Sequence, residues 1–302
     1  MDISANGGRV RPTRDIGGVT MDLNGVEKIQ VNAAGGADNI TINDLTRTGV
    51  TQVAIDLSGP SGSGQGDGAA DSVTVNGTAG RDSISVATIG ASVVVNGLSA
   101  QVTIAGTEGA NDSLVVSRGA GDDTINASAL NAGQVKLTIN GGAGDDIITA
   151  SKGDDVVIGG QGSDKALLGA GNDTFVWNPG NGSDMVDGQA GNDTLQSKGA
   201  NVAENIDISA NAGHARLVRD IATITMDLDN VETINVQALG GADKITVNDL
   251  TGTDVNKVNI DLGGSSGGGD GSDDTIVINA TSGDDVITVT NNNDVITVSG
   301  LR

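Results

Sequence analysis

The chain has 302 residues, among them 48 glycines, one phenylalanine and one tryptophan, and it has no tyrosine and no cysteine. So few aromatic side chains exclude a thick two-layer core, and the lack of cysteine excludes disulfides and thiolate metal sites. Acidic residues outnumber basic residues by 39 to 16, so the net charge is −23. This charge argues against a nucleic-acid partner, because phosphate binding needs a basic face. It also makes a compact state depend on cations that offset the repulsion.

Residues 1–117 contain short, alternating runs of Val, Ile and Thr that predict β-strands, and no segment shows a helical period. The segment 2–59 recurs with many identities at 207–264, an offset of 205 residues. We therefore predict a β-solenoid flanking module over 1–117 and a second, truncated copy over 201–302. We also expect the chain to be part of a longer tandem array of such modules. No run approaches the roughly 18 apolar residues of a membrane span.

The central segment consists of nine-residue repeats. Six consecutive repeats fill residues 141–196, interrupted once by Trp177 and Asn178, and a seventh at 118–126 precedes them. Every repeat has glycine at position four and aspartate at position six. Position eight is a bulky apolar residue except in the repeat 159–167, where it is Ala166. These repeats define the predicted central domain, residues 118–200.

The composition of the repeat predicts a loop followed by a short strand. Glycine permits a tight loop with positive φ, and the last three residues form a strand whose apolar residue points inward. Two repeats make one turn of a coil, so the position-six aspartates alternate between two edges. One edge is expected to hold Asp123, Asp146, Asp164 and Asp184, and the other Asp155, Asp173 and Asp193.

Stacked loops of this kind offer hard oxygen ligands. Ca²⁺ takes 6–8 oxygens in flexible geometry, whereas Mg²⁺ requires a rigid octahedron and retains its water. No histidine or cysteine accompanies the loops, so zinc and copper are poor candidates. We expect about five calcium ions in the central β-roll. We also expect the calcium-free form to be loose or unfolded, because its carboxylates repel one another.

The candidate metal-binding residues are the position-six aspartates and the loop glycines. They are Asp123, Gly141, Gly142, Gly144, Asp146, Gly153, Asp155, Gly159, Gly160, Gly162, Asp164, Gly169, Gly171, Asp173, Gly180, Gly182, Asp184, Gly188, Gly191 and Asp193. Weaker candidates are Asp38, Asp243 and Asp285, which keep the Gly-x-Asp-x-Ile spacing outside the central segment. The alternative is a metal-free solenoid in which these aspartates only shape turns.

Residues 141–196 resemble the haemolysin-type calcium-binding repeats of the repeats-in-toxin (RTX) proteins. The resemblance implies an all-β fold, a right-handed parallel β-roll or β-helix solenoid with calcium-binding Gly/Asp loops. It also implies calcium-triggered folding, type I secretion from a Gram-negative bacterium, and the position-six aspartate as side-chain ligand. The sequence departs from the pattern at Ala150, Ser151 and Lys152, and again at Lys165 and Ala166, which puts the sites at Asp164 most in doubt.

The pattern favours a non-catalytic, extracellular or cell-surface module that serves as a calcium-stiffened spacer or adhesin. Its expected partners are calcium, neighbouring modules of the same protein, and cell-surface or matrix ligands. One alternative is an accessory folding and secretion module of an exported enzyme. Another is a β-helix polysaccharide lyase or epimerase, which the single His214 and the absence of tyrosine disfavour. Trp177 is expected to cover the core, with a sugar-stacking platform as the alternative.

Overall fold

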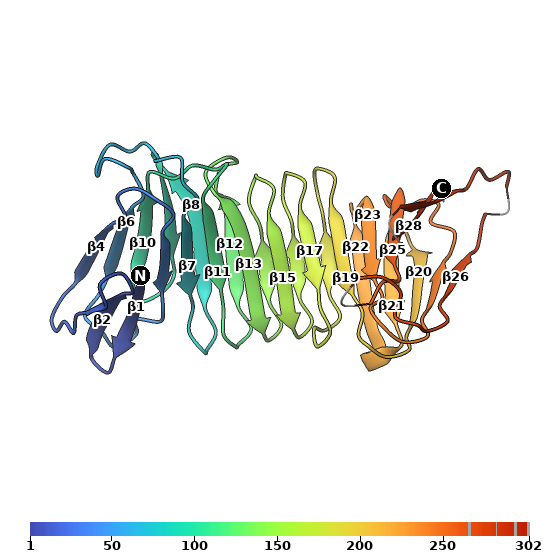
Figure 1. Cartoon of the computed structure of the whole chain (residues 1–302), viewed down its shortest axis with the longest axis horizontal. Coiled ribbons are helices and arrows are strands. Elements are labelled where there is room, and N and C mark those ends of the chain that lie inside the picture. The colour runs from blue at the N-terminus through green and yellow to red at the C-terminus, as the bar shows by residue number, and fades with distance from the viewer. Residues whose placement is uncertain (265–266, 282, 293–294, 301–302) are drawn as a thin grey trace. The chain divides into compact units, whose positions relative to one another are not determined.

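The computed structural model describes residues 1–264, 267–281, 283–292 and 295–300. Ser282, which opens the degenerate repeat of the candidate Asp285, and the last two residues of the predicted segment 201–302 lie outside the described residues. The chain divides into two compact units, Met1–Asp155 and Val156–Arg302. In each unit the chain alternates between two β-sheets, and most neighbouring strands of a sheet pair in parallel (Figure 1).

The first unit contains strands β1 to β14. In stacking order, its first sheet comprises β3 (Val19–Thr20), β2 (Arg9–Arg14), β1 (Asp2–Asn6), β5 (Asn39–Ile42), β7 (Ser72–Asn76), β11 (Ser113–Ser117) and β13 (Lys136–Ala143). Its second sheet comprises β4 (Lys28–Asn32), β6 (Gln52–Asp56), β10 (Gln101–Ala105), β9 (Ser92–Asn96), β8 (Ser83–Ile89), β12 (Thr124–Ala129) and β14 (Ile147–Thr149).

The second unit contains strands β15 to β28. Its first sheet comprises β15 (Val156–Gln161), β17 (Thr174–Trp177), β19 (Thr194–Lys198), β23 (Thr233–Gln237), β25 (Lys257–Asp261), β28 (Val295–Ser299) and β27 (Thr288–Asn292). Its second sheet comprises β16 (Lys165–Leu167), β18 (Met185–Asp187), β22 (Ile224–Asp229), β21 (His214–Arg219), β20 (Asn205–Asn211), β24 (Lys244–Val247) and β26 (Thr275–Ile278). A 3₁₀ turn at Ile221–Thr223 is the one helical element among the described residues.

Parallel pairing in register aligns the apolar residues of successive strands, even where the loops between the strands differ in length. Val73, Leu114 and Leu137 are aligned across β7, β11 and β13, and all three are buried. Since side chains alternate between the two faces of a strand, the in-register stack builds a continuous aliphatic core. The all-β, parallel-stranded solenoid predicted from the sequence is confirmed within each unit.

Position eight of every nine-residue repeat lies in this core. Ile148, Phe175 and Leu195 are fully buried, and Ala166 is buried as well. The residue before each of these faces outward, so the three-residue strands β14, β16 and β18 each carry one inward side chain. Each turn of the repeat segment therefore contributes little apolar area of its own and depends on its neighbours for burial.

Trp177 is buried, and its indole Nε1 donates a hydrogen bond to the Gly182 carbonyl at 2.8 Å. The guanidinium of Arg219 lies 5.3 Å from the centre of the Trp177 ring. With the ring covered in this way, Trp177 is a core residue and not an exposed sugar-stacking platform.

Antiparallel hairpins interrupt the parallel stack outside the repeats. β1 and β2 pair antiparallel, as do β8 and β9, and β20 and β21. Their turns contain residues with positive φ, such as Gly7 at 63° and Gly213 at 99°, as expected for tight hairpins. The sequence analysis did not predict these hairpins.

Candidate metal-binding loops

The position-six aspartates are buried although their carboxyl groups are ionisable. Among the described residues, Asp123, Asp146 and Asp173 are each only 1% exposed, and the other position-six aspartates are equally hidden. Each lies directly before the first residue of a strand, at the edge where the loop enters the sheet. Burying carboxylates costs several kcal/mol for each uncompensated ion, so their surroundings must supply compensation.

Successive aspartates of one edge stack on one another. The backbone N–H of Asp123 donates to Oδ1 of Asp146 at 2.8 Å. In the second unit, Asp164 N–H donates to Asp184 Oδ1 at 3.0 Å, and Asp173 N–H donates to Asp193 Oδ1 at 2.8 Å. The two contacts in the second unit join every second repeat, and the contact in the first unit joins the repeat 118–126 to the repeat 141–149 across a longer loop.

The glycines allow the loops to stack at backbone distance. Gly144 has a φ of 131°, and a Cβ on it would collide with the Gly121 carbonyl of the loop below. A Cβ on Gly142, whose φ is 100°, would lie 2.6 Å from the Gly119 carbonyl oxygen. Both conditions favour glycine, because an L side chain is strained at such φ values and would force the loops apart.

The remaining candidate glycines lie in equivalent loops. Gly160, Gly162, Gly169, Gly171, Gly180 and Gly191 share positive φ values, whereas Gly141, Gly153, Gly159, Gly182 and Gly188 do not. Gly141 and Gly142 fall at the end of β13, and Gly159 and Gly160 fall in β15. These two strands therefore extend into the loops, further than the three-residue strands that the repeat predicts.

The donor chemistry of the columns fits a hard cation. Oδ2 of Asp123 and Oδ2 of Asp184 are buried and accept no hydrogen bond from the described residues. Burial, supported by the nearby Asp164, raises the pKa of Asp184 to about 8. Burial likewise raises the pKa of Asp155 to about 6. A bound divalent ion would lower both pKa values, because nearby positive charge favours the ionised carboxylate.

An ion here would draw on backbone as well as side chains. Within the described ranges, no group of three or more His, Asp or Glu side chains is positioned to hold a metal. A pair of stacked aspartates would therefore share the ion with carbonyl oxygens of the adjoining glycine loops. Mixed carboxylate and carbonyl oxygens are ligands that suit Ca²⁺.

Three weaker candidates lie outside the repeats and differ in their surroundings. Asp243 is buried, its pKa is raised to about 6 by burial, and its N–H donates to Asp274 Oδ1 at 3.0 Å. Asp38 is half-buried, and its N–H donates to Asp71 Oδ1 at 2.8 Å. Asp285 is exposed, and its Oδ1 accepts from the Thr281 hydroxyl at 2.7 Å. Asp285 therefore has the geometry of a residue that fixes a turn.

The columns also contain acidic residues that the sequence analysis missed. Asp71 N–H donates to Asp112 Oδ1 at 3.0 Å, Asp82 N–H to Asp123 Oδ1, and Asp193 N–H to Glu232 Oε2. The signal that marks them is an acidic residue two positions before a buried apolar residue, with no glycine requirement. It occurs in Asp71-Ser72-Val73 and in Glu232-Thr233-Ile234.

Residues 140–175 and 180–197 match the sequence profile of the RTX calcium-binding nonapeptide repeat family, in four copies. These residues carry RTX repeats. The gap in the match contains the Trp177-Asn178 insertion. The repeat at 118–126 lies outside the matched residues. No curated protein matches the chain. RTX repeats bind calcium, and the matched residues contain the position-six aspartates from Asp146 to Asp193. Among the described residues, no helix has the length and apolar character needed to cross a membrane.

Proposed function

We propose that the chain is a non-catalytic repeat module of a type I secreted bacterial protein, in which calcium completes the fold of the RTX segment and stiffens it as an extracellular spacer or adhesin stalk. The observation that carries this proposal is the column of buried, stacked aspartates. The side-chain ligands would be Asp123, Asp146, Asp155, Asp164, Asp173, Asp184 and Asp193, together sharing about five ions.

Calcium would act mainly on the balance between folded and unfolded chains. Without the ion, each turn must desolvate carboxylates while burying a single large apolar side chain, such as Ile148 or Val186. Because a solenoid turn contacts only its neighbours, its stability is a sum of local terms. An unfavourable term repeated at each loop therefore lowers the stability of the whole segment, and a bound ion at each loop restores it.

This dependence suits an exported protein. A chain that stays loose at low calcium can be exported unfolded, and it folds outside the cell, where calcium is abundant. Affinities of about 10⁻⁴–10⁻³ M are sufficient for extracellular calcium modules. The composition is compatible with a load-bearing role, since the parallel stack repeats one local interface along the chain.

Force spectroscopy on single chains tests the spacer role. Pulled from its ends in calcium, the chain is expected to resist and then lengthen in steps as groups of loops open. In chelator, the RTX segment should extend without a force barrier. Equal resistance in both solutions would contradict the proposal, as would a chain that never resists in calcium.

A further inference from the structure

The column of aspartates begins before the RTX segment. Asp82 N–H donates to Asp123 Oδ1 at 2.6 Å, and Asp123 N–H donates to Asp146 Oδ1 at 2.8 Å. The two steps have the same backbone geometry. Asp82 and Asp123 precede β8 and β12, which pair in parallel register, as do β12 and β14. We call each pair of stacked acidic residues a step. Judged by stacking alone, the step from Asp82 to Asp123 is as suited to bind an ion as the step from Asp123 to Asp146.

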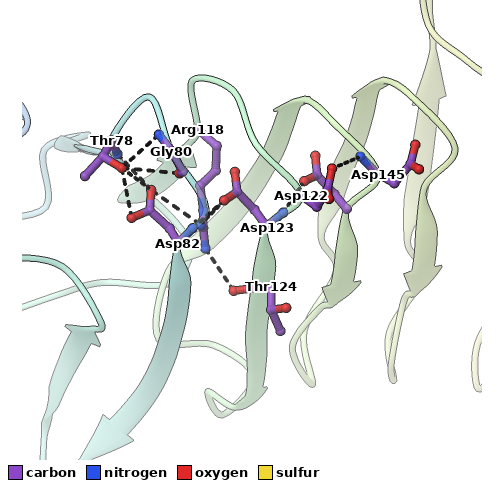
Figure 2. Close-up of polar contacts among 9 residues, drawn as sticks. Thr78, Gly80, Asp82, Arg118, Asp122, Asp123, Thr124 and Asp145 are labelled. Atoms are coloured by element: carbon purple, nitrogen blue, oxygen red, sulfur yellow. Dashed lines mark hydrogen bonds and ion pairs between the residues drawn. The ribbon is translucent and has the colours of Figure 1, made fainter.

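The two steps differ in one side chain. Arg118, the first residue of the repeat 118–126, has its side chain fully buried between Asp82 and Asp123 (Figure 2). Its Nη1 lies 3.2 Å from Asp123 Oδ1 and 3.7 Å from Asp82 Oδ2. Its Nη2 donates to the Thr124 carbonyl at 2.9 Å. The later repeats begin with Gly141, Ala150, Gly159, Leu168, Pro179 and Gly188, none of which carries a charge.

A guanidinium is chemically able to act as a fixed counter-ion. It is always charged and presents several donors in one plane, which match carboxylate oxygens. Arg118 thus supplies positive charge at this step. The Asp82 carboxylate also accepts a hydrogen bond at its Oδ2 from the N–H of Thr78 at 2.8 Å. The Asp123 carboxylate keeps its other oxygen, Oδ2, buried and without a hydrogen bond among the described residues.

We propose that Arg118 is a resident cation that takes the place of calcium between Asp82 and Asp123, and so makes the Asp123–Asp146 step the first one in this column that requires calcium. The inference rests on the proposed function of the RTX loops. Its consequence is that β8 and β12 are joined at this edge without calcium. This strand pair would support the first calcium-dependent loop.

The second unit contains a comparable arrangement beyond the RTX segment. Glu204 precedes β20, and its N–H donates to Asp243 Oδ1 at 2.9 Å, so it occupies a column position. Arg219 donates to Glu204 Oε1, and both side chains are buried. A buried arginine thus contacts an acidic column at two independent places, one in each unit, which supports the role assigned to Arg118.

Removal of the guanidinium tests the inference. In Arg118→Gln, the Asp82–Asp123 step loses its positive charge. We expect the variant to bind about one more calcium ion than the unaltered chain in equilibrium dialysis. We also expect its melting temperature in chelator to be lower than that of the unaltered chain, and most of this difference to disappear in calcium.

Arg81→Gln is the matched control. Arg81 pairs with Asp122 at 2.8 Å in the same loops, but both side chains are exposed. This control should change neither the ion count nor the calcium dependence.

A second variant keeps the test decisive if Arg118→Gln fails to fold. Asp82→Asn removes a carboxylate of the same step and leaves Arg118 in place, and we expect it to retain every bound ion. Loss of one ion in Asp82→Asn would show that calcium already occupies this step and would overturn the inference. So would an unchanged ion count in a folded Arg118→Gln. Absence of calcium binding by the unaltered chain would instead refute the proposed function.

Discussion

At the scale of single residues, burial decides which acidic groups matter. Asp145 and Asp146 are neighbours in the sequence, yet Asp145 is exposed while Asp146 is buried against the next loop. Likewise, Ile147 is half-exposed while Ile148 is fully buried. The sequence predicts both distinctions from the repeat position alone, because positions six and eight face inward in every copy.

The neighbouring aspartates provide a matched test of the ligand assignment. Asp146→Asn removes a buried carboxylate from the column and should raise the calcium concentration at the folding midpoint about tenfold, or ~1.4 kcal/mol. Asp145→Asn removes the same charge at an exposed site and should shift the midpoint less than about twofold. Trp177 fluorescence during calcium titration reports the midpoint. Equal shifts in the two variants would mean that general charge, not ligation, sets the calcium dependence.

The raised pKa values predict how pH acts on the calcium-free chain. Asp184 and Asp155 titrate at about 8 and about 6 when folded, against 3.8 ordinarily. Between these values the folded chain binds more protons than the unfolded chain. The stability that protonation contributes is therefore fully present below about pH 4 and is lost as pH rises through 6 to 8.

Thermal unfolding of calcium-stripped protein at several pH values measures this effect. The melting midpoint should be higher at pH 5 than at pH 7.5. With calcium present the trend should reverse, because protons compete with the ion for the same carboxylates. A calcium-free midpoint that does not change between pH 5 and pH 7.5 would contradict the raised pKa values of these two buried aspartates.

At the scale of elements, strands of three residues are stable only through their neighbours. β14 pairs with β12 through Ile125 and Ile148, both fully buried. Ile148→Ala should cost about 2–5 kcal/mol in calcium, from lost burial and the cavity left behind. Ile147→Ala, on the outward face, should cost less than about 1 kcal/mol. Denaturant unfolding of both variants compares them. Similar losses would mean that β14 does not face the core as described.

The sequence predicts repeat strands better than it predicts the flanking strands. A nine-residue period fixes both the loop and the inward position, so the strands of 141–196 follow directly. In the flanking segments no such period exists, and the hairpins depend on local turns. The turn signal was present, since Asn6-Gly7-Gly8 separates two strands and Asn211-Ala212-Gly213 separates two others. Such Gly-containing turns between alternating strands are typical of hairpins.

The metal-binding loops, like the repeat strands, could be predicted from the sequence because the repeat has a fixed period. Glycine and aspartate at a fixed spacing mark the RTX loops. The buried arginines could not be predicted in this way, because Arg118 and Arg219 have no distinctive sequence context. Arg219 is adjacent to Asp220 in the sequence, but it pairs with Glu204, fifteen positions earlier in the chain. Only folding brings these two side chains together.

At the scale of the whole molecule, two features limit the stability of the fold. They are the net charge of −23 and the thin aliphatic core. The described core contains one phenylalanine and one tryptophan among Val, Ile, Leu and Ala side chains. Self-repulsion opposes compaction, and each RTX loop adds buried carboxylates. Calcium offsets both effects at once, which is why its binding and the folding of the RTX segment are expected to be a single event.

Far-ultraviolet circular dichroism of the chelated protein during calcium titration tests this coupling most directly, with magnesium as the control ion. The account predicts a cooperative gain of β-sheet signal with calcium and little or none with magnesium. A smaller β signal should be present in chelator from strands such as β8 and β12, which Arg118 joins. A complete β-sheet signal in chelator that calcium leaves unchanged would contradict the account, because the aspartates would then only shape turns.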